Sequence, residues 1–155
     1  MIKDTLESGQ KSDAAITSKF GNWPSKISSD LIVSDSISID EAKLTSQALY
    51  YIERRPQEKG RCVIVRHADG QSSDLLPAPY SARSRVHEYG GGCYCVVEDE
   101  NTDRIFFVND SDQDIYLIDD GQVTKITDAP DSRFADFGYD SNQHRLISIC
   151  ETHID

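Results

Sequence analysis

The chain has 155 residues, which is enough for one domain with a hydrophobic core, and 37% of them are hydrophobic. The net charge of −11 disfavours binding to nucleic acid or to an anionic membrane surface, and no apolar run is long enough to cross a bilayer. The first residues also lack the apolar core of a signal peptide, so we expect a cytoplasmic protein that binds neither nucleic acid nor membrane.

The N-terminal segment, residues 1–19, is polar and without hydrophobic periodicity, which predicts a disordered leader. The folded region is expected to span residues 20–155. Near its start, Trp23 and Pro24 are expected to anchor the entering chain, because a lone Trp is more often a packing residue than a recognition residue. Residues 41–47 come nearest to a helix, but they are too short and too polar to predict one.

The rest of the chain is a series of short strand signals. These runs are rich in Val, Ile, Tyr and Phe and are bounded by Gly, Pro, Asn and Asp. The expected strands are Leu49–Glu53, Arg61–Arg66, Gly92–Glu98, Arg104–Asn109, Asp114–Asp119, Val123–Thr127, Ala135–Tyr139 and Arg145–Cys150.

An internal repeat sets the architecture. Asp69-Gly70 and Asp120-Gly121 are both tight-hairpin dipeptides, and they lie 51 residues apart, from 69 to 120. A third copy of the repeat opens at Arg145. A unit of about 40–50 residues with four strands is typical of a propeller blade. We therefore predict an all-β fold, an incomplete β-propeller of about two four-stranded blades plus the start of a third.

A ring of this kind closes with typically about four to eight blades. The sequence therefore predicts a segment of a longer propeller, or a chain that assembles with copies of itself, and its uncovered edges predict self-association. The core between the blades is expected to contain the aromatic residues that alternate along the strands, Tyr50, Tyr51, Phe106 and Phe107.

Metal binding and cofactors are not expected. Cys62, Cys93, Cys95 and Cys150 each lie in an apolar strand-like run, which favours buried thiols over a zinc site. The acidic run from Asp110 to Asp114 resembles half of a calcium loop. It lacks the Gly and Glu that such a loop needs at its sixth and twelfth positions, so it is interpreted as a polar loop between strands.

The best candidate for function is the run from His87 to Gly92. Three successive glycines (Gly90, Gly91 and Gly92) carry an entropic cost, so some backbone geometry must require them. In one interpretation Arg85, His87, Glu88 and Tyr89 contact a peptide substrate, with Glu88 pairing with its amino terminus. In the other interpretation, the run is a crossover between blades, with glycines for close packing and Glu88 bonded to Arg85 or a backbone amide.

Several segments, taken in this order, resemble a known family. They are Gly21-Asn-Trp-Pro-Ser-Lys-Ile27, Arg85-Val-His-Glu-Tyr-Gly-Gly-Gly92, Asp112-Gln113, Tyr116-Leu-Ile-Asp119 and Arg133-Phe-Ala-Asp136. From about Phe20 to its end the chain resembles the N-terminal propeller of the prolyl oligopeptidase superfamily, in its acylaminoacyl-peptidase and dipeptidyl-aminopeptidase-like branch. The resemblance implies a serine-type peptidase whose propeller covers the active site and admits small peptides.

In such peptidases a C-terminal α/β-hydrolase domain carries the Ser-Asp-His triad, and these 155 residues contain no such domain. The one Gly-x-Ser, at Gly70, is not completed to Gly-x-Ser-x-Gly because position 74 is Asp. We therefore name no catalytic residue. We expect a non-catalytic segment, inactive alone, that gates and positions small peptides for the missing hydrolase domain. The alternatives are a stand-alone, oligomerising propeller-like protein-binding module and, with weaker support, a metal-dependent enzyme such as a lactonase.

Overall fold

The computed structural model describes residues 19–21, 27, 36–98 and 103–153. The chain divides into two units, Met1–Ser34 and Asp35–Asp155. Of the first unit only residues 19–21 and 27 are described, so the predicted leader up to residue 18 and the predicted Trp23-Pro24 anchor lie outside the described residues. Among the described residues, no helix is long and apolar enough to cross a bilayer.

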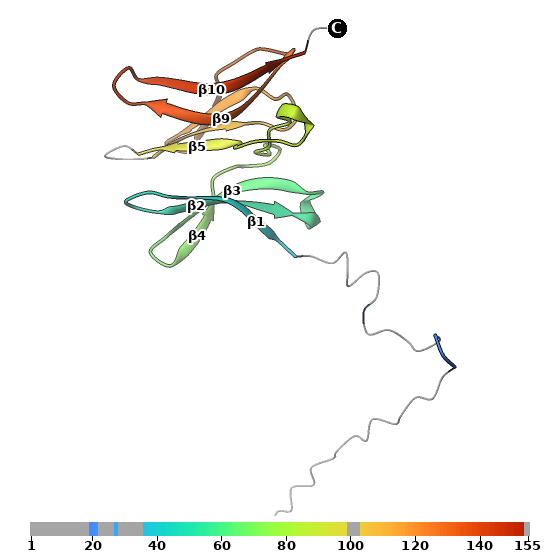
Figure 1. Ribbon diagram of the computed structural model, residues 1–155. Helices are drawn as coiled ribbons and strands as arrows, with labels where there is room; N and C mark the ends of the chain where they lie inside the picture. The colour runs from blue at the N-terminus through green and yellow to red at the C-terminus, as the bar shows by residue number, and fades with distance from the viewer. Residues whose placement is uncertain (1–18, 22–26, 28–35, 99–102, 154–155) are drawn as a thin grey trace, which may run out of the picture. The chain divides into compact units, whose positions relative to one another are not determined.

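The second unit consists of antiparallel sheets and two short 3-10 turns, η1 and η2. Its sheets have the strand orders β1-β2-β3-β4, β5-β6-β7-β8 and β10-β9, and they are stacked as layers in Figure 1. The predicted fold class, an incomplete propeller with two four-stranded blades and the start of a third, is confirmed. The bounds are β1 Ser38–Leu44, β2 Leu49–Arg55, η1 Pro56–Glu58, β3 Arg61–Ala68, β4 Gln71–Asp74, η2 Val86–Glu88, β5 Tyr94–Val97, β6 Arg104–Val108, β7 Ile115–Asp119, β8 Gln122–Lys125, β9 Ser132–Asp140 and β10 Arg145–Thr152.

The two predicted hairpin turns occupy equivalent places in the first two sheets. Asp69 and Gly70, between β3 and β4, have φ values of 52° and 74°. Asp120 and Gly121, between β7 and β8, have φ values of 44° and 73°. Positive φ at both central residues is the geometry that matches the twist of the flanking strands. The repeat in the sequence is thus a repeat of whole blades.

Two strands, β1 and β4, were not predicted. β4 is fully exposed and polar, so it carries no apolar alternation. β1 includes part of the segment that came nearest to a helix, and its register shifts between Asp40 and Lys43, where Glu41 adopts a left-handed φ of 49°. A bulge of this kind breaks the two-residue period on which strand prediction depends.

The core lies mainly between the first two sheets. Tyr50 and Phe107 are fully buried there, with 1% and 0% of their surface exposed. Tyr51 and Phe106 are half-buried, and the Phe106 ring stacks on Tyr139 of β9 with 6.3 Å between centroids. Packing between sheets is therefore confirmed for Tyr50, Phe106 and Phe107, and the two Phe rings lie on opposite faces of β6. Tyr51 lies on the other face of β2 from Tyr50, and its hydroxyl is 3.3 Å from the Ser72 hydroxyl of the same sheet.

Three of the four predicted buried thiols, Cys62, Cys93 and Cys95, are buried. The prediction is wrong for Cys150, which is exposed because the described residues leave much of β10 uncovered. All four cysteines are free, and the described part of the chain contains no cluster of three or more His, Cys, Asp or Glu residues with metal-binding geometry.

Candidate functional site

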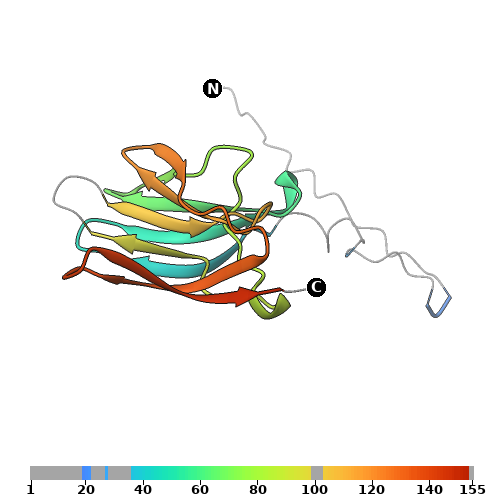
Figure 2. The ribbon, with the colours of Figure 1, turned by 90° about the horizontal axis from the view of Figure 1, so that it is seen from above.

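The run from His87 to Gly92 lies in the crossover that leads from β4 to β5. The crossover is fixed to both sheets by backbone hydrogen bonds: Ala82 donates to Cys62 of β3 over 2.9 Å, and Arg83 donates to Val108 of β6 over 3.0 Å. Its turn η2 lies beside the C-terminal end of β10 (Figure 2). The candidate residues are therefore held where all three sheets meet.

Gln113 holds the crossover from the second sheet. This residue is buried and has a left-handed φ of 60°. Its side-chain oxygen accepts a hydrogen bond from the Arg85 backbone N–H over 2.7 Å, and its side-chain nitrogen donates to the carbonyls of Arg83 (3.2 Å) and Asp110 (3.1 Å). The Asp-Gln motif thus positions the segment that precedes His87, a role that sequence reasoning did not assign.

Both the side chain and the backbone carbonyl of Arg85 bind neighbouring residues. Its guanidinium pairs with the Asp110 carboxylate at 3.0 Å and also donates to the Asp110 carbonyl. Its own carbonyl accepts a hydrogen bond from Arg133 over 3.1 Å. These contacts make Arg85 part of the support for the crossover, although its side chain stays about half exposed.

His87 and Glu88 both adopt left-handed backbone conformations, with φ values of 53° and 62°. Such conformations are unfavourable for non-glycine residues and persist only where the surroundings impose them. The His87 N–H donates to the Glu151 carboxylate of β10 over 2.9 Å, and the His87 ring nitrogen Nδ1 lies 3.5 Å from the same carboxylate. The Glu88 N–H donates to the Arg85 carbonyl over 3.0 Å. The loop backbone is therefore firmly set.

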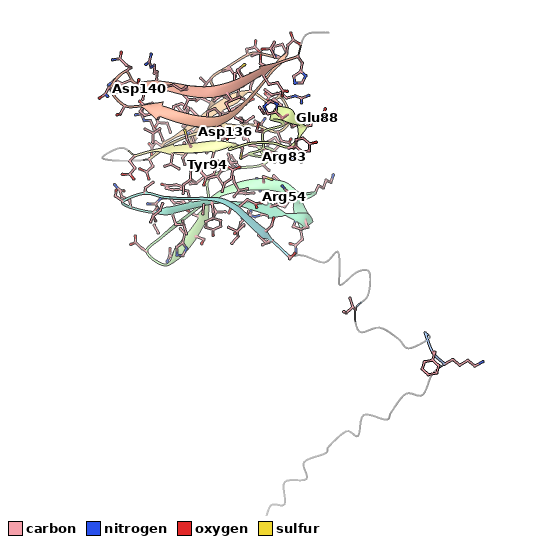
Figure 3. The ribbon with its side chains drawn as sticks, viewed as in Figure 1. Arg54, Arg83, Glu88, Tyr94, Asp136 and Asp140 are labelled. Carbon is pink, nitrogen blue, oxygen red and sulfur yellow. The ribbon has the colours of Figure 1, made fainter. Side chains whose placement is uncertain are left out.

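The side chains of Glu88 and Tyr89 project away from this fixed backbone. Tyr89 is 98% exposed, and Glu88 is also exposed. Within the described residues, neither side chain has a hydrogen-bond or ion-pair partner, so the expected bond from the Glu88 side chain to Arg85 is not formed. Glu88 is labelled in Figure 3 at the edge of the sheets.

The glycines bring the crossover close to β9. A Cβ atom on Gly91 would lie 2.9 Å from the Cβ of Ala135, closer than real Cβ contacts come. Gly90 has a φ of 88°, and its N–H donates to the Val86 carbonyl over 3.0 Å. The Gly92 N–H donates to the Asp136 carboxylate over 2.7 Å.

Like Asp136, the carboxylate of Glu41, in β1 of the first sheet, binds a backbone N–H at the end of the crossover. Glu41 accepts hydrogen bonds from the Cys93 N–H at 3.0 and 3.3 Å, and its carbonyl accepts one from the Tyr94 hydroxyl. Burial, and secondly the Glu41 charge, raise the pKa of the Cys93 thiol well above its ordinary value. Because side chains take these backbone donors, β5 begins at Tyr94 and not at the predicted Gly92. Nothing in the sequence pattern indicated this role for Glu41.

The acidic loop between β6 and β7 uses its carboxylates internally. Asp112 accepts hydrogen bonds from Tyr116 (2.7 Å) and from Asn109, while Asp114 pairs with Lys125 at 2.7 Å. Asp110 pairs with Arg85, as described above. The interpretation as a polar loop between strands is confirmed.

No family model matches the chain, and no curated protein matches it. Several solved structures do match the chain. A puromycin-hydrolyzing peptidase from Mycobacterium tuberculosis is 29% identical with a TM-score of 0.79, over 86% of this chain and 21% of that one. A puromycin hydrolase is 25% identical with a TM-score of 0.72, over 85% of this chain and 22% of that one. A mutant puromycin hydrolase complexed with PGG gives the same identity and TM-score over 80% and 20%.

The chain therefore spans about a fifth of the length of the solved structures it matches. These likenesses confirm the predicted resemblance to the N-terminal propeller region of peptidases of the prolyl oligopeptidase superfamily.

Proposed function

We propose that this chain is the N-terminal propeller segment of a serine peptidase of the prolyl oligopeptidase type, and that it gates and positions small peptides for a C-terminal hydrolase domain. Its likeness to a fifth of the length of peptidase chains supports this assignment. The chemistry of bond cleavage belongs to the hydrolase domain in this proposal, and the propeller segment contributes shape and charge.

The observation that carries the proposal is the Glu88 carboxylate, which has no partner among the described residues and stands on a fixed backbone. A carboxylate held in this way is suited to bind the protonated amino terminus of a peptide through charge-assisted hydrogen bonds. Tyr89, almost fully exposed beside it, offers an aromatic surface and a hydroxyl to the same ligand. Because the backbone is already ordered, binding would not have to order it first.

The other candidate residues have different parts in this proposal. Arg85 and His87 hold the loop through Asp110 and Glu151, and they keep enough exposure to reach a peptide as well. Gly91 and Gly92 allow the loop to lie against β9, and Gly90, with its φ of 88°, packs against the Ser84 carbonyl. Together they fix the position from which Glu88 projects. In this proposal, the rigid loop where three blades meet restricts which peptides reach the hydrolase domain.

Calorimetric titration of the chain with triglycinamide and N-acetyl-triglycine tests the role of Glu88. Triglycinamide retains the amino terminus, and we expect Glu88→Gln to weaken its binding about tenfold, the cost of one charge-assisted contact of about 1.4 kcal/mol. Asp119→Asn, which changes the exposed carboxylate at the end of β7, is the matched control and should leave the affinity unchanged. Equal affinity of wild type and Glu88→Gln would overturn the role. Gating is tested in the peptidase that carries these blades, where hydrolysis should fall steeply as substrate length increases.

One observation favours the alternative, a stand-alone propeller-like protein-binding module that oligomerises. Ile147 and Ile149 of β10 are 54% and 48% exposed, whereas Phe106 in the corresponding strand of the second blade packs on Tyr139 of the next sheet. A neighbouring chain could cover β10 in the same way. A discrete closed oligomer in light scattering, for a gene with no downstream hydrolase sequence, would support this alternative over the peptidase segment.

A further inference from the structure

A cleft of about 320 Å³ opens between the first sheet and the crossover. Its walls include Arg54, the penultimate residue of β2, and Arg83, Tyr89, Gly90 and Gly91 of the crossover. Figure 3 labels Arg54, Arg83 and Glu88 at the same end of the sheets. The cleft therefore borders the loop that carries Glu88.

The two arginines that line the cleft have no carboxylate partner among the described residues. By contrast, Arg55, Arg61 and Arg145 each form an ion pair. In a chain with a net charge of −11, two unpaired guanidinium groups at one cleft are unexpected. They leave planar forks of N–H donors available to an anion from outside the chain.

Both arginines act on the same point of the cleft wall, the Cys62 side chain. Arg54 lies opposite Cys62 in the β2–β3 register, and the Ala82 N–H, one residue before Arg83, donates to the Cys62 carbonyl over 2.9 Å. Burial raises the pKa of the Cys62 thiol, while the positive charges of Arg54 and Arg83 both oppose the rise. The Asp110 carboxylate adds to the rise, so the field at Cys62 includes both guanidinium groups and one carboxylate.

The acidic residues at the cleft balance the formal charge of the two arginines. Asp40 and Glu41 also line the cleft, so two carboxylates face two guanidinium groups there. The Glu41 carboxylate accepts hydrogen bonds from the Cys93 N–H. The cleft is therefore formally neutral, and what it offers an anion is the N–H donors of its two guanidinium groups, which form no ion pair among the described residues. Arginine pairs bind carboxylates through parallel hydrogen bonds that give both affinity and orientation.

We propose that Arg54 and Arg83 form a subsite for the C-terminal carboxylate of a short peptide. The subsite rests on the proposed function, since it assumes that the peptide's amino terminus lies at Glu88. A short zwitterionic peptide then matches the site at both ends, amine to carboxylate and carboxylate to guanidinium. Peptides with a free carboxyl terminus are the substrate class that this arrangement selects.

The test is calorimetric titration of the chain with N-acetyl-triglycine, which has the carboxylate but no amine, and with triglycinamide, which has the amine but no carboxylate. Arg54→Gln and Arg83→Gln should each weaken N-acetyl-triglycine about tenfold and leave triglycinamide unchanged. Arg145→Gln is the matched control, because Arg145 is an exposed arginine paired with Asp140 in the third sheet. Neither cleft arginine has a carboxylate partner to lose, so the variants should fold.

The outcomes separate this subsite from the role of Glu88. Unchanged binding of N-acetyl-triglycine in both arginine variants overturns the subsite, while triglycinamide binding that depends on Glu88 still supports the proposed function. Arginine-dependent binding of N-acetyl-triglycine without any binding of triglycinamide supports the subsite and overturns the amine site. Binding of neither compound overturns both. Tighter binding of an amidated, acetylated peptide with an internal Asp overturns the assignment to the C-terminal carboxylate.

Discussion

Gly92 and Asp136 form two hydrogen bonds with each other, and these bonds join the second blade to the third. The Gly92 N–H donates to the Asp136 carboxylate over 2.7 Å, and the Asp136 N–H donates to the Gly92 carbonyl over 2.8 Å. Asp136 has a left-handed φ of 55°, which Asp tolerates better than most residues. The pair fixes the last glycine of the crossover against β9.

Replacing Asp136 by Ala should destabilise the chain by about 1–3 kcal/mol, because the Gly92 N–H loses its acceptor and Ala tolerates the left-handed backbone poorly. Urea unfolding followed by circular dichroism measures the change. Asp119→Ala, at the exposed end of β7, should shift the midpoint little. If both variants unfold at the same urea concentration as wild type, the Gly92–Asp136 pair does not stabilise the blades.

Gly91→Ala should also destabilise, by about 1–3 kcal/mol, because the new methyl group would sit 2.9 Å from the Ala135 Cβ and force the crossover away from β9. The matched control is Gly138→Ala, also at the third sheet, where an added Cβ meets no atom within 4 Å. Thermal unfolding of the two variants side by side makes the comparison. An equal melting temperature for both would contradict the close approach at Gly91.

Stability should fall in acid through Asp114. Burial opposes ionisation of this carboxylate, but hydrogen bonds from Lys125 and Thr127 outweigh it and lower its pKa. A carboxyl group whose pKa is lower in the folded state stabilises the fold above its unfolded pKa, and that contribution is lost as the pH falls through the folded pKa. Urea unfolding between pH 6 and pH 2 should therefore show a smaller acid loss in Asp114→Asn than in wild type. An identical pH dependence in the two proteins would show that Asp114 does not cause the loss of stability in acid.

Self-association of the chain should depend on β10. Ile147→Thr and Ile149→Thr remove exposed apolar surface from this strand, so we expect a smaller weight-average mass in light scattering at high protein concentration. Leu44→Thr, which removes another exposed apolar side chain at the end of β1, serves as the control. A wild-type chain that stays monomeric throughout, with a cooperative melt, would refute the expectation.

Much of the fold follows from the sequence because the repeat preserves its turn chemistry. Asp69-Gly70 and Asp120-Gly121 specify the same hairpin wherever they occur, and the apolar runs beside them form the strands. β1 could not be predicted, because the bulge at Glu41 interrupts its alternation. Cys150 was misplaced because a strand pattern does not reveal which face another layer covers.

The candidate site was predictable only in outline. The glycines near Tyr89 identified the crossover, since their cost required a geometric reason. The residues that set its position, Gln113, Glu41 and Glu151, reach it through left-handed turns or from distant strands. Contacts between residues far apart in the chain leave no local pattern in a single sequence.

The bulges in β1 and β9 also limit how such a propeller can grow. Glu41 and Asp136 are each the left-handed residue at a bulge in the first strand of their sheet. Their carboxylates accept hydrogen bonds from the N–H groups of the adjacent residues Cys93 and Gly92. The second blade is therefore fastened by both neighbours at one point. A blade inserted on either side by gene duplication would have to bring its own bulged carboxylate, so blades of this type are exchangeable only together with their neighbours' first strands.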